Sequence, residues 1–248
     1  MTHNGPLYLR YHQRTLVSES SPTPGSVVVS DDPGKIYFKT YSRFPRIALP
    51  DPTPPHTPSL HACILGRKSE RSFSRHSMMQ LVDLSRILVG LQITSDEGHT
   101  DYHSRRAYPS AGKCYPIEAY ILPLRVEGLK HHAYHYHVRT HSLEEMWPFG
   151  DSDFGACFSR DHWCRDAGAV VVLTGCHARG YLKYLEKAYQ YCLLEAGHAA
   201  QNIHLLSAGE GLNCCSYGGF YDKPLMRLLD LNPNEEILLH TLLVGKKA

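Results

Sequence analysis

One segment of the chain places three cations and a hydroxyl within five residues, Arg67-Lys68-Ser69-Glu70-Arg71. Arg67 could grip a phosphate through two parallel hydrogen bonds, and Ser69 could add another. Alternate side chains of an extended segment also point the same way. The residues therefore favour an anion site. The alternative is a solvated run of surface charge.

Two further segments consist mainly of small residues, which let a ligand approach the backbone closely. They are Pro109-Ser110-Ala111-Gly112 and Tyr217-Gly218-Gly219, and a planar ligand could lie against either. The pair Lys183-Tyr184 falls in a predicted helix, and by itself it indicates only two adjacent helix residues, one solvated and one half-buried.

The 17 histidines raise the question of a metal site. Five of them gather in a predicted hairpin, in which alternation places two on one strand face. These five are His131, His132, His135, His137 and His141, with His135 and His137 on the shared face. A metal site also needs a third ligand, which nothing nearby specifies. We predict no metal and expect solvated strand histidines.

The eight cysteines include no Cys-x-x-Cys spacing, so zinc-ribbon, ferredoxin and thioredoxin sites of that pattern are excluded. We expect reduced thiols that pack as small apolar groups. Cys214 and Cys215 could form a vicinal disulfide, but two thiols in a turn are favoured for a protein of the cytoplasm.

Composition and missing motifs exclude several classes of protein. The chain has 248 residues, of which 42% are hydrophobic and 20% charged, and a net charge of +2, which argues against nucleic acid as a partner. The longest apolar run, 167–173, is far shorter than the ~20 residues of a membrane span. Residues 1–14 also lack the apolar stretch of a signal peptide. No dinucleotide-binding, P-loop, zinc-protease or esterase motif occurs. We expect a cytoplasmic protein with no membrane contact.

Hydrophobic periodicity predicts two helices that could position these residues. One covers 78–91, and a longer, central one covers 181–208 and ends at Gly209 and Gly211. Four small residues of the longer helix would let another backbone pack closely against it: Ala196, Gly197, Ala199 and Ala200.

Strands are expected where β-branched and aromatic residues concentrate. The expected ranges are 115–124, 133–139, 169–174 and 236–244, and a turn at 126–129 joins the first two. The third range is apolar throughout, as in a strand that is covered on both faces.

The first 60 residues differ from the rest, because they hold ten of the sixteen prolines. Proline fixes φ and is excluded from helix interiors. We therefore expect an extended arm and proline-rich linker over 1–60, followed by one α+β domain over 61–248.

Taken in order, these segments resemble the FMN-dependent nitroreductase superfamily, and within it the SagB/ThcOx-type azoline dehydrogenases. The similarity runs nearly end to end. The matching segments are Tyr11-His12-Gln13-Arg14-Thr15, Phe38-Lys39-Thr40-Tyr41, Leu49-Pro50, the Arg-x-Ser-x-Arg segment, Pro-Ser-Ala-Gly before Tyr115-Pro116, Lys183-Tyr184, Glu195 to Asn202, and Gly218 to Gly245.

The resemblance implies a nitroreductase-like mixed or antiparallel sheet flanked by helices, and a homodimer in which both chains build each FMN site. By motif position, Arg67 and Ser69 would meet the phosphate and ribityl chain of FMN. Arg71 would meet the pyrimidine edge of the flavin, and Lys68 would belong to the same site.

The two small-residue loops complete the FMN site that the resemblance implies. Pro109, Ser110 and Ala111 would lie against the flavin ring from the partner chain. The backbone of Tyr217, Gly218 and Gly219 would face the flavin near its reactive nitrogen.

In the family, a Lys-Tyr pair at the place of Lys183 and Tyr184 is assigned to the dehydrogenation. Oxidation of an azoline removes a proton from one ring carbon and a hydride from its neighbour, so a base must lie beside the ring. Adjacent helical side chains diverge by about 100°, which keeps the two from reaching one atom without a local bend. We expect Lys183 to be the base and Tyr184 the positioning donor.

The resemblance thus predicts an oxidoreductase that dehydrogenates a thiazoline, oxazoline or similar ring in a peptide natural product and passes electrons to oxygen. Departures from the family pattern are Lys113, where reductases of the superfamily often carry Asn, and Leu185, Lys187 and Gln190 after the Lys-Tyr pair. A nicotinamide-dependent nitro or quinone reductase and a non-catalytic flavin-binding subunit are the alternatives. The substrate is either a small heterocycle or a peptide that a biosynthetic partner protein delivers.

Overall fold

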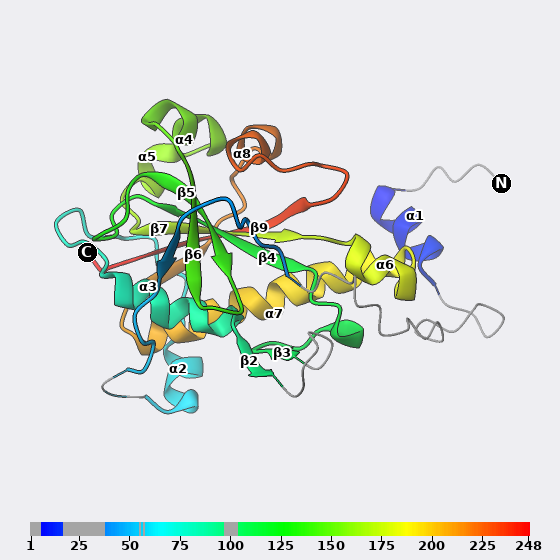
Figure 1. Ribbon diagram of the computed structural model, residues 1–248, viewed down its shortest axis with the longest axis horizontal. Coiled ribbons are helices and arrows are strands. Elements are labelled where there is room, and N and C mark those ends of the chain that lie inside the picture. The colour runs from blue at the N-terminus through cyan, green and yellow to red at the C-terminus, as the bar shows by residue number, and fades with distance from the viewer. Residues whose placement is uncertain (1–5, 17–37, 55, 57, 97–103) are drawn as a thin grey trace.

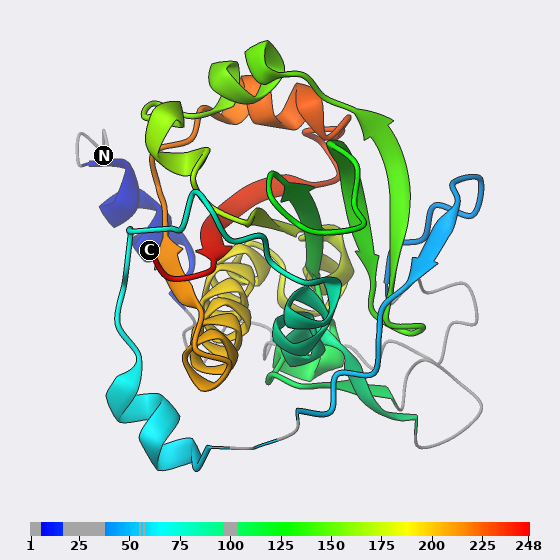
Figure 2. The ribbon, with the colours of Figure 1, turned by 90° about the vertical axis from the view of Figure 1, so that its left-hand side faces the viewer.

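A seven-stranded sheet forms the middle layer of the protein, and helices cover both of its faces (Figures 1 and 2). The strand order is β1-β6-β5-β4-β7-β9-β8, and every neighbouring pair is antiparallel. The computed structural model describes residues 6–16, 38–54, 56, 58–96 and 104–248. The expected α+β class and antiparallel sheet flanked by helices are confirmed.

All four predicted strands are present, and they form the centre of the sheet. They are β4 (Ile117–Pro123), β5 (His132–His137), β7 (Ala169–Gly175) and β9 (Ile237–Gly245). β4 and β5 form the expected hairpin, and its turn places Gly128 at a φ of +81°. Every residue of β7 is buried, as its apolar run predicted.

Five strands were not predicted. β1 (Arg46–Ala48), β6 (Ser142–Pro148) and β8 (Asn213–Ser216) belong to the main sheet, and β2 (Ile93–Asp96) and β3 (Ser104–Arg106) form a separate pair. β6 has no apolar alternation because Ser142 and Glu144 are buried in it.

Each face of the sheet has its own hydrophobic core and its own helices (Figure 2). One face packs against α3 (Leu81–Leu88), the 3-10 turn η1 (Val89–Leu91) and α7 (Lys187–Gly209). The other face packs against α4 (Asp151–Cys157), α5 (Asp161–Cys164) and α8 (Asp222–Leu228). Within the described ranges, no helix is long and apolar enough to cross a membrane.

The helix predicted over 181–208 is divided into two, so the prediction of one uninterrupted helix is wrong. α6 covers Ala178–Tyr184, Leu185 has a φ of +49° and a ψ of −137°, and α7 begins at Lys187. α7 ends at Gly209, close to the expected position. Ala196, Ala199 and Ala200 are buried in the core, whereas Gly197 is exposed with open space where a side chain would lie: no atom is within 4 Å of an added Cβ.

The expectation of an extended arm is wrong for α1 (Leu7–Arg14). Its only proline, Pro6, directly precedes the helix, where a missing N–H and a fixed φ are compatible with helix formation. The Tyr11 hydroxyl donates a hydrogen bond to the Glu186 carbonyl at 3.2 Å, and its ring meets that of Tyr189 edge-on. α1 is therefore docked at the start of α7, on the right of Figure 1.

Candidate functional site

The arginine-rich segment lies along β8, the edge strand of the sheet. Arg67 directly follows α2 (Leu60–Gly66) and is half-buried. Ser69 forms a parallel bridge with Cys214, and the Glu70 N–H donates to the Cys214 carbonyl at 3.1 Å. The segment is thus extended, as its alternating pattern predicted.

The Tyr217–Gly219 loop follows β8 directly and lies close to the same segment, with the Trp163 ring between them. The guanidinium carbon of Arg71 is 5.1 Å from the centroid of the Trp163 ring, and the Tyr217 ring is 5.5 Å from it. An added Cβ on Gly219 would lie 2.5 Å from the Tyr217 hydroxyl, so a larger residue does not fit there. Gly218 faces open space.

We refer to Arg67, Ser69, Arg71 and the Tyr217–Gly219 loop as the arginine cluster. A surface pocket of about 790 Å³ adjoins it, lined by Ser69, Arg71 and neighbours that include the C-terminal Ala248. Lys68 is turned to the surface, where its ammonium group pairs with Glu70 at 2.7 Å. The structure therefore brings together the two predicted arginines, Ser69 and the loop, whereas the Lys68 side chain points away and pairs with Glu70.

Two histidines flank the Ser216 hydroxyl, and one of them, His204, lies near Arg67. Burial, and then the charge of Arg67, lower the pKa of His204 to about 4. Burial also lowers the pKa of His240. The Nε2 atoms of His204 and His240 are 3.0 and 2.9 Å from the Ser216 hydroxyl. The imidazole of His204 near Arg67 is therefore uncharged at neutral pH.

Lys183 and Tyr184 lie at the end of α6 and face the Pro109–Lys113 loop. An added Cβ on Gly112 would lie 2.5 Å from the Tyr184 hydroxyl and 2.7 Å from Lys183 Nζ. Both side-chain ends therefore meet at the same glycine. Adjacent helical side chains were expected to reach one point only with a local bend, and α6 does end in such a bend, at Leu185 directly after Tyr184.

We refer to Ser110, Ala111, Gly112, Lys183 and Tyr184 as the lysine–tyrosine cluster. Ser110 and Ala111 are half-buried and Pro109 is exposed. Tyr184 meets the ring of Tyr191 edge-on at 4.9 Å, and burial raises the pKa of its hydroxyl.

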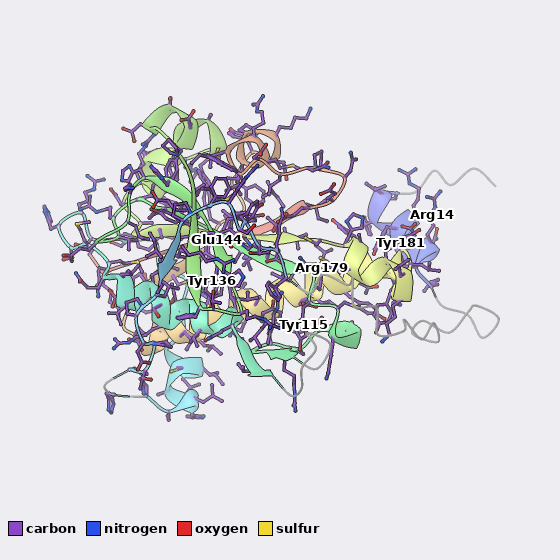
Figure 3. The ribbon with its side chains drawn as sticks, in the orientation of Figure 1. Arg14, Tyr115, Tyr136, Glu144, Arg179 and Tyr181 are labelled. Atoms are coloured by element: carbon purple, nitrogen blue, oxygen red, sulfur yellow. The ribbon has the colours of Figure 1, made fainter. Side chains whose placement is uncertain are left out.

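The backbone around this cluster is strained. Lys113, Tyr115 and Leu185 have φ values of +54°, +44° and +49°, although none is a glycine. Such conformations cost of order 1–3 kcal/mol each and concentrate at functional sites. The loop is held by two hydrogen bonds, from the Tyr115 N–H to the Ser110 hydroxyl at 2.8 Å and from Arg179 to the Tyr115 carbonyl at 2.9 Å. Figure 3 shows Arg179 and Tyr115 close together at this end of the sheet.

The two clusters lie at opposite ends of α7. Cys63 of α2 contacts the end of α7, where its sulfur would be 3.3 Å from an added Cβ on Gly209. Lys183 and Tyr184 precede the start of α7 at Lys187. α7 has 23 residues and is therefore about 35 Å long. One chain alone does not join the two clusters.

The expectation of solvated strand histidines is wrong for His135, His137 and His141, which are buried, whereas His131 is exposed. In the part of the chain that the structure describes, no group of three or more His, Cys, Asp or Glu could hold a metal ion. His135 is fully buried, with Nδ1 2.8 Å from Glu144 and Nε2 3.1 Å from Glu118. Burial opposes its protonation, but the two glutamates raise the pKa of His135. His137 is also buried.

The two glutamates are held in the charged form by their neighbours. Burial opposes ionisation, but Arg179 at 2.6 Å and His135 keep the pKa of Glu118 well below its usual range. In the same way, His135 and Arg46 lower the pKa of Glu144 to about 2. Arg179 therefore binds both Glu118 of β4 and the Tyr115 carbonyl, so it connects the Tyr115 loop to the buried network on the sheet.

All eight cysteines are free thiols, as expected, and six of them are buried. Cys214 and Cys215 lie in strand β8 and not in the expected turn.

Sequence reasoning missed two residues that border the clusters, His204 and Glu195. Both are buried on α7. The signal was available, since each falls among apolar residues on the inward face of the predicted helix, where a charged or ionisable side chain is unusual.

Comparison with known proteins bears on what these clusters do. Residues 64–246 match the sequence profile of the nitroreductase family. The chain belongs to the nitroreductase family. A proposed nitroreductase of Methanocaldococcus jannaschii is 28% identical over 192 residues, which cover 76% of this chain and 91% of that protein. The microcin B17-processing protein McbC of Escherichia coli is 24% identical over 167 residues, 65% of this chain and 60% of that protein.

Solved structures of nitroreductase-like proteins share the fold. A proposed nitroreductase from Anabaena variabilis has a TM-score of 0.69 and 25% identity, covering 95% of this chain and 45% of that one. The E. coli microcin synthetase McbBCD complex with truncated pro-MccB17 has a TM-score of 0.60 and 20% identity, and the match covers 96% of this chain and 86% of that one. A proposed nitroreductase from Exiguobacterium sibiricum in complex with FMN has a TM-score of 0.54 and 11% identity, covering 79% and 91%.

Proposed function

We propose that this nitroreductase-family chain binds FMN at the arginine cluster, within residues 61–248. The relative from E. sibiricum holds FMN, and the residues of this chain suit that molecule. Arg67 and Ser69 offer a cation and a hydroxyl for the phosphate and ribityl chain, and Arg71 offers a second cation for the flavin edge. The backbone at Gly218 can be approached by a planar ring, since no atom of the described residues lies within 4 Å of an added Cβ there.

We propose that the protein is a homodimer that pairs the two clusters across its interface. α7 presents exposed apolar side chains beside its start, with Tyr189 40%, Leu193 44% and Leu194 53% exposed. Contiguous exposed apolar surface of this kind marks interaction sites. A two-fold pairing of antiparallel α7 helices would bring the lysine–tyrosine cluster of one chain near the arginine cluster of the other. Ser110 and Ala111 would then lie against the flavin of the partner.

We propose that the reaction is dehydrogenation of an azoline, or a similar ring, in a peptide-derived substrate. The observation that carries this proposal is the meeting of Lys183 Nζ and Tyr184 Oη at Gly112, in a strained loop. The likeness to McbC, a protein that processes a microcin, supports a peptide-derived substrate. The McbBCD complex also supports a biosynthetic partner that delivers the substrate.

In this reaction the chain must hold the ring and take a proton from it. Lys183 is the proposed base, and the Tyr184 hydroxyl positions the ring beside it. Gly112 allows both side-chain ends to come this close to the loop, because an added Cβ would lie within 2.7 Å of each. When bound, FMN would accept the hydride, and oxygen would receive the electrons.

A second candidate is a nicotinamide-dependent reductase of nitro or quinone compounds. The relative from M. jannaschii favours it, because that protein is named a nitroreductase and is the more similar of the two. Rapid oxidation of a nicotinamide in the presence of a quinone would support the reductase. Flavin that is reduced only by an azoline substrate would support the dehydrogenase.

The experiment that tests the dehydrogenase is single-turnover flavin reduction by an azoline peptide in Lys183→Ala and Tyr184→Phe. Each variant is first shown to retain FMN. Loss of a general base predicts a rate ~10²–10⁴-fold lower with flavin retained. Lys130→Ala is the matched control, because the Lys130 side chain is 70% exposed and its ammonium group pairs with Glu145 at 2.9 Å. Near-normal reduction in both variants would reject the dehydrogenase in favour of the reductase or a non-catalytic flavin-binding subunit.

A further inference from the structure

Glu195 is a buried carboxyl group on α7 behind the lysine–tyrosine cluster. Glu195 is only 2% exposed, and its Oε1 atom has no hydrogen-bond partner among the described residues. A buried carboxylate without full hydrogen bonding is costly, so its retention in a well-packed helix calls for an explanation.

The surroundings of Glu195 raise the pKa of its carboxyl group to a value near neutral pH. Burial raises the pKa of Glu195 to about 7, although a hydrogen bond with Ser110 and the charges of Arg106 and Arg179 oppose the shift. These two arginines approach from β3 and α6. Two further titratable groups lie nearby, and the charge of Glu195 contributes to raising the pKa of both the Tyr108 hydroxyl and the Cys192 thiol.

Ser110 connects Glu195 to the strained loop. The Ser110 hydroxyl accepts a hydrogen bond from the Tyr115 N–H at 2.8 Å and has a single proton to donate. An ionised Glu195 only accepts, so the Ser110 proton must then point at the carboxylate. A protonated Glu195 can itself donate to Ser110, which releases the hydroxyl proton of Ser110 for another acceptor.

We propose that Glu195 is a positioning residue for Ser110, and that its proton decides whether the Ser110 hydroxyl can donate a hydrogen bond to a bound ligand. With Glu195 ionised, Ser110 donates its proton to the carboxylate in a charge-assisted bond, so toward a ligand it can only accept. With Glu195 protonated, Ser110 becomes a donor on the side that faces the ligand. The second half of this proposal rests on the proposed function, in which Ser110 borders the flavin.

The first test needs neither flavin nor substrate. In ¹⁵N-labelled protein, the amide resonance of Tyr115 should shift with pH, with a midpoint near 7 that reports Glu195. The step should vanish in Glu195→Gln, which keeps the shape of the side chain but does not titrate. It should also vanish in Ser110→Ala, which keeps the carboxyl but removes the hydroxyl. A step that persists in either variant would overturn the link from Glu195 through Ser110 to the loop.

The second test measures FMN affinity by flavin fluorescence between pH 6 and 8.5. Gain or loss of one hydrogen bond predicts a change of about threefold to tenfold across the step. The FMN phosphate itself titrates at about pH 6, so the effect of Glu195 is the difference between the wild type and Glu195→Gln, which should lack the step near 7. Equal pH profiles of affinity in the two proteins, with the amide step present in the wild type, would overturn the ligand half of the proposal. A protein that binds no flavin at all would instead reject the proposed function and leave the amide result standing.

Discussion

The substitution Gly112→Ala tests whether the meeting point of Lys183 and Tyr184 matters for function. The new methyl group would lie 2.5 Å from the Tyr184 hydroxyl and 2.7 Å from Lys183 Nζ. Ordinary contacts are about 3.5 Å, so each side-chain end must move by ~1 Å. Both are the ends of flexible side chains, so the fold should survive. Because a ~1 Å misplacement of reacting groups can cost ~10²-fold, we expect a large loss of turnover.

The backbone contributes a separate and smaller effect on stability. Gly112 has a φ of +56°, and an alanine there costs ~1–2 kcal/mol, or ~2–8 °C in Tm for a chain of this size. Gly128→Ala is the matched control, since Gly128 has a φ of +81° and nothing lies within 4 Å of an added Cβ. Thermal melts should show similar losses in the two variants. Single-turnover flavin reduction should be impaired only in Gly112→Ala, and equal rates in both variants would refute the argument.

Three further substitutions test other parts of the structure. Arg67→Ala should weaken FMN binding ~10–100-fold in a fluorescence titration, because a charge-assisted bond of ~1.5–3 kcal/mol is lost. The control Lys130→Ala should bind FMN normally. Unchanged affinity in Arg67→Ala would reject the proposed position of the phosphate. Among the described residues no atom lies within 4 Å of an added Cβ on Gly197, so Gly197→Leu should act on the interface. It should lose dimer and flavin together by light scattering and absorbance, and a flavin-loaded dimer would contradict the pairing. His135→Gln removes a histidine of raised pKa, so the advantage of the wild type in urea unfolding should be complete below about pH 6.5 and decline above it. An advantage that grows with pH would show that His135 is not held protonated.

The central strands were predictable because the apolar residues of each strand are enough to indicate that it is buried. β7 is a continuous run of apolar side chains, and both faces of it are covered. β6 carries no such signal, since Glu144 is buried in it by a contact with His135, nine residues earlier on the neighbouring strand. The burial of a polar side chain depends on its partner, and periodicity within one segment does not contain that partner.

The break after α6 was not predictable for a related reason. Leu185 is a residue that favours helix, and neither glycine nor proline stands beside it. Its φ of +49° is therefore not signalled by its residue type, and the helical pattern runs on through it. For the candidate site, the sequence predicted the residue types of both clusters and the helix that separates them. It did not predict that Lys183 and Tyr184 meet at Gly112, because that approach depends on how the loop and α6 are placed.

The separation of the two clusters by the length of α7 has a genetic consequence. If each site takes its arginines from one chain and its Lys-Tyr pair from the other, two inactive variants can rescue each other. A hybrid of an Arg67→Ala chain and a Lys183→Ala chain would contain one site with both defects and one with none. Random exchange of subunits makes half of the dimers hybrid, and each hybrid has one intact site of two. An equal mixture of the two impaired variants should therefore recover about a quarter of the wild-type activity.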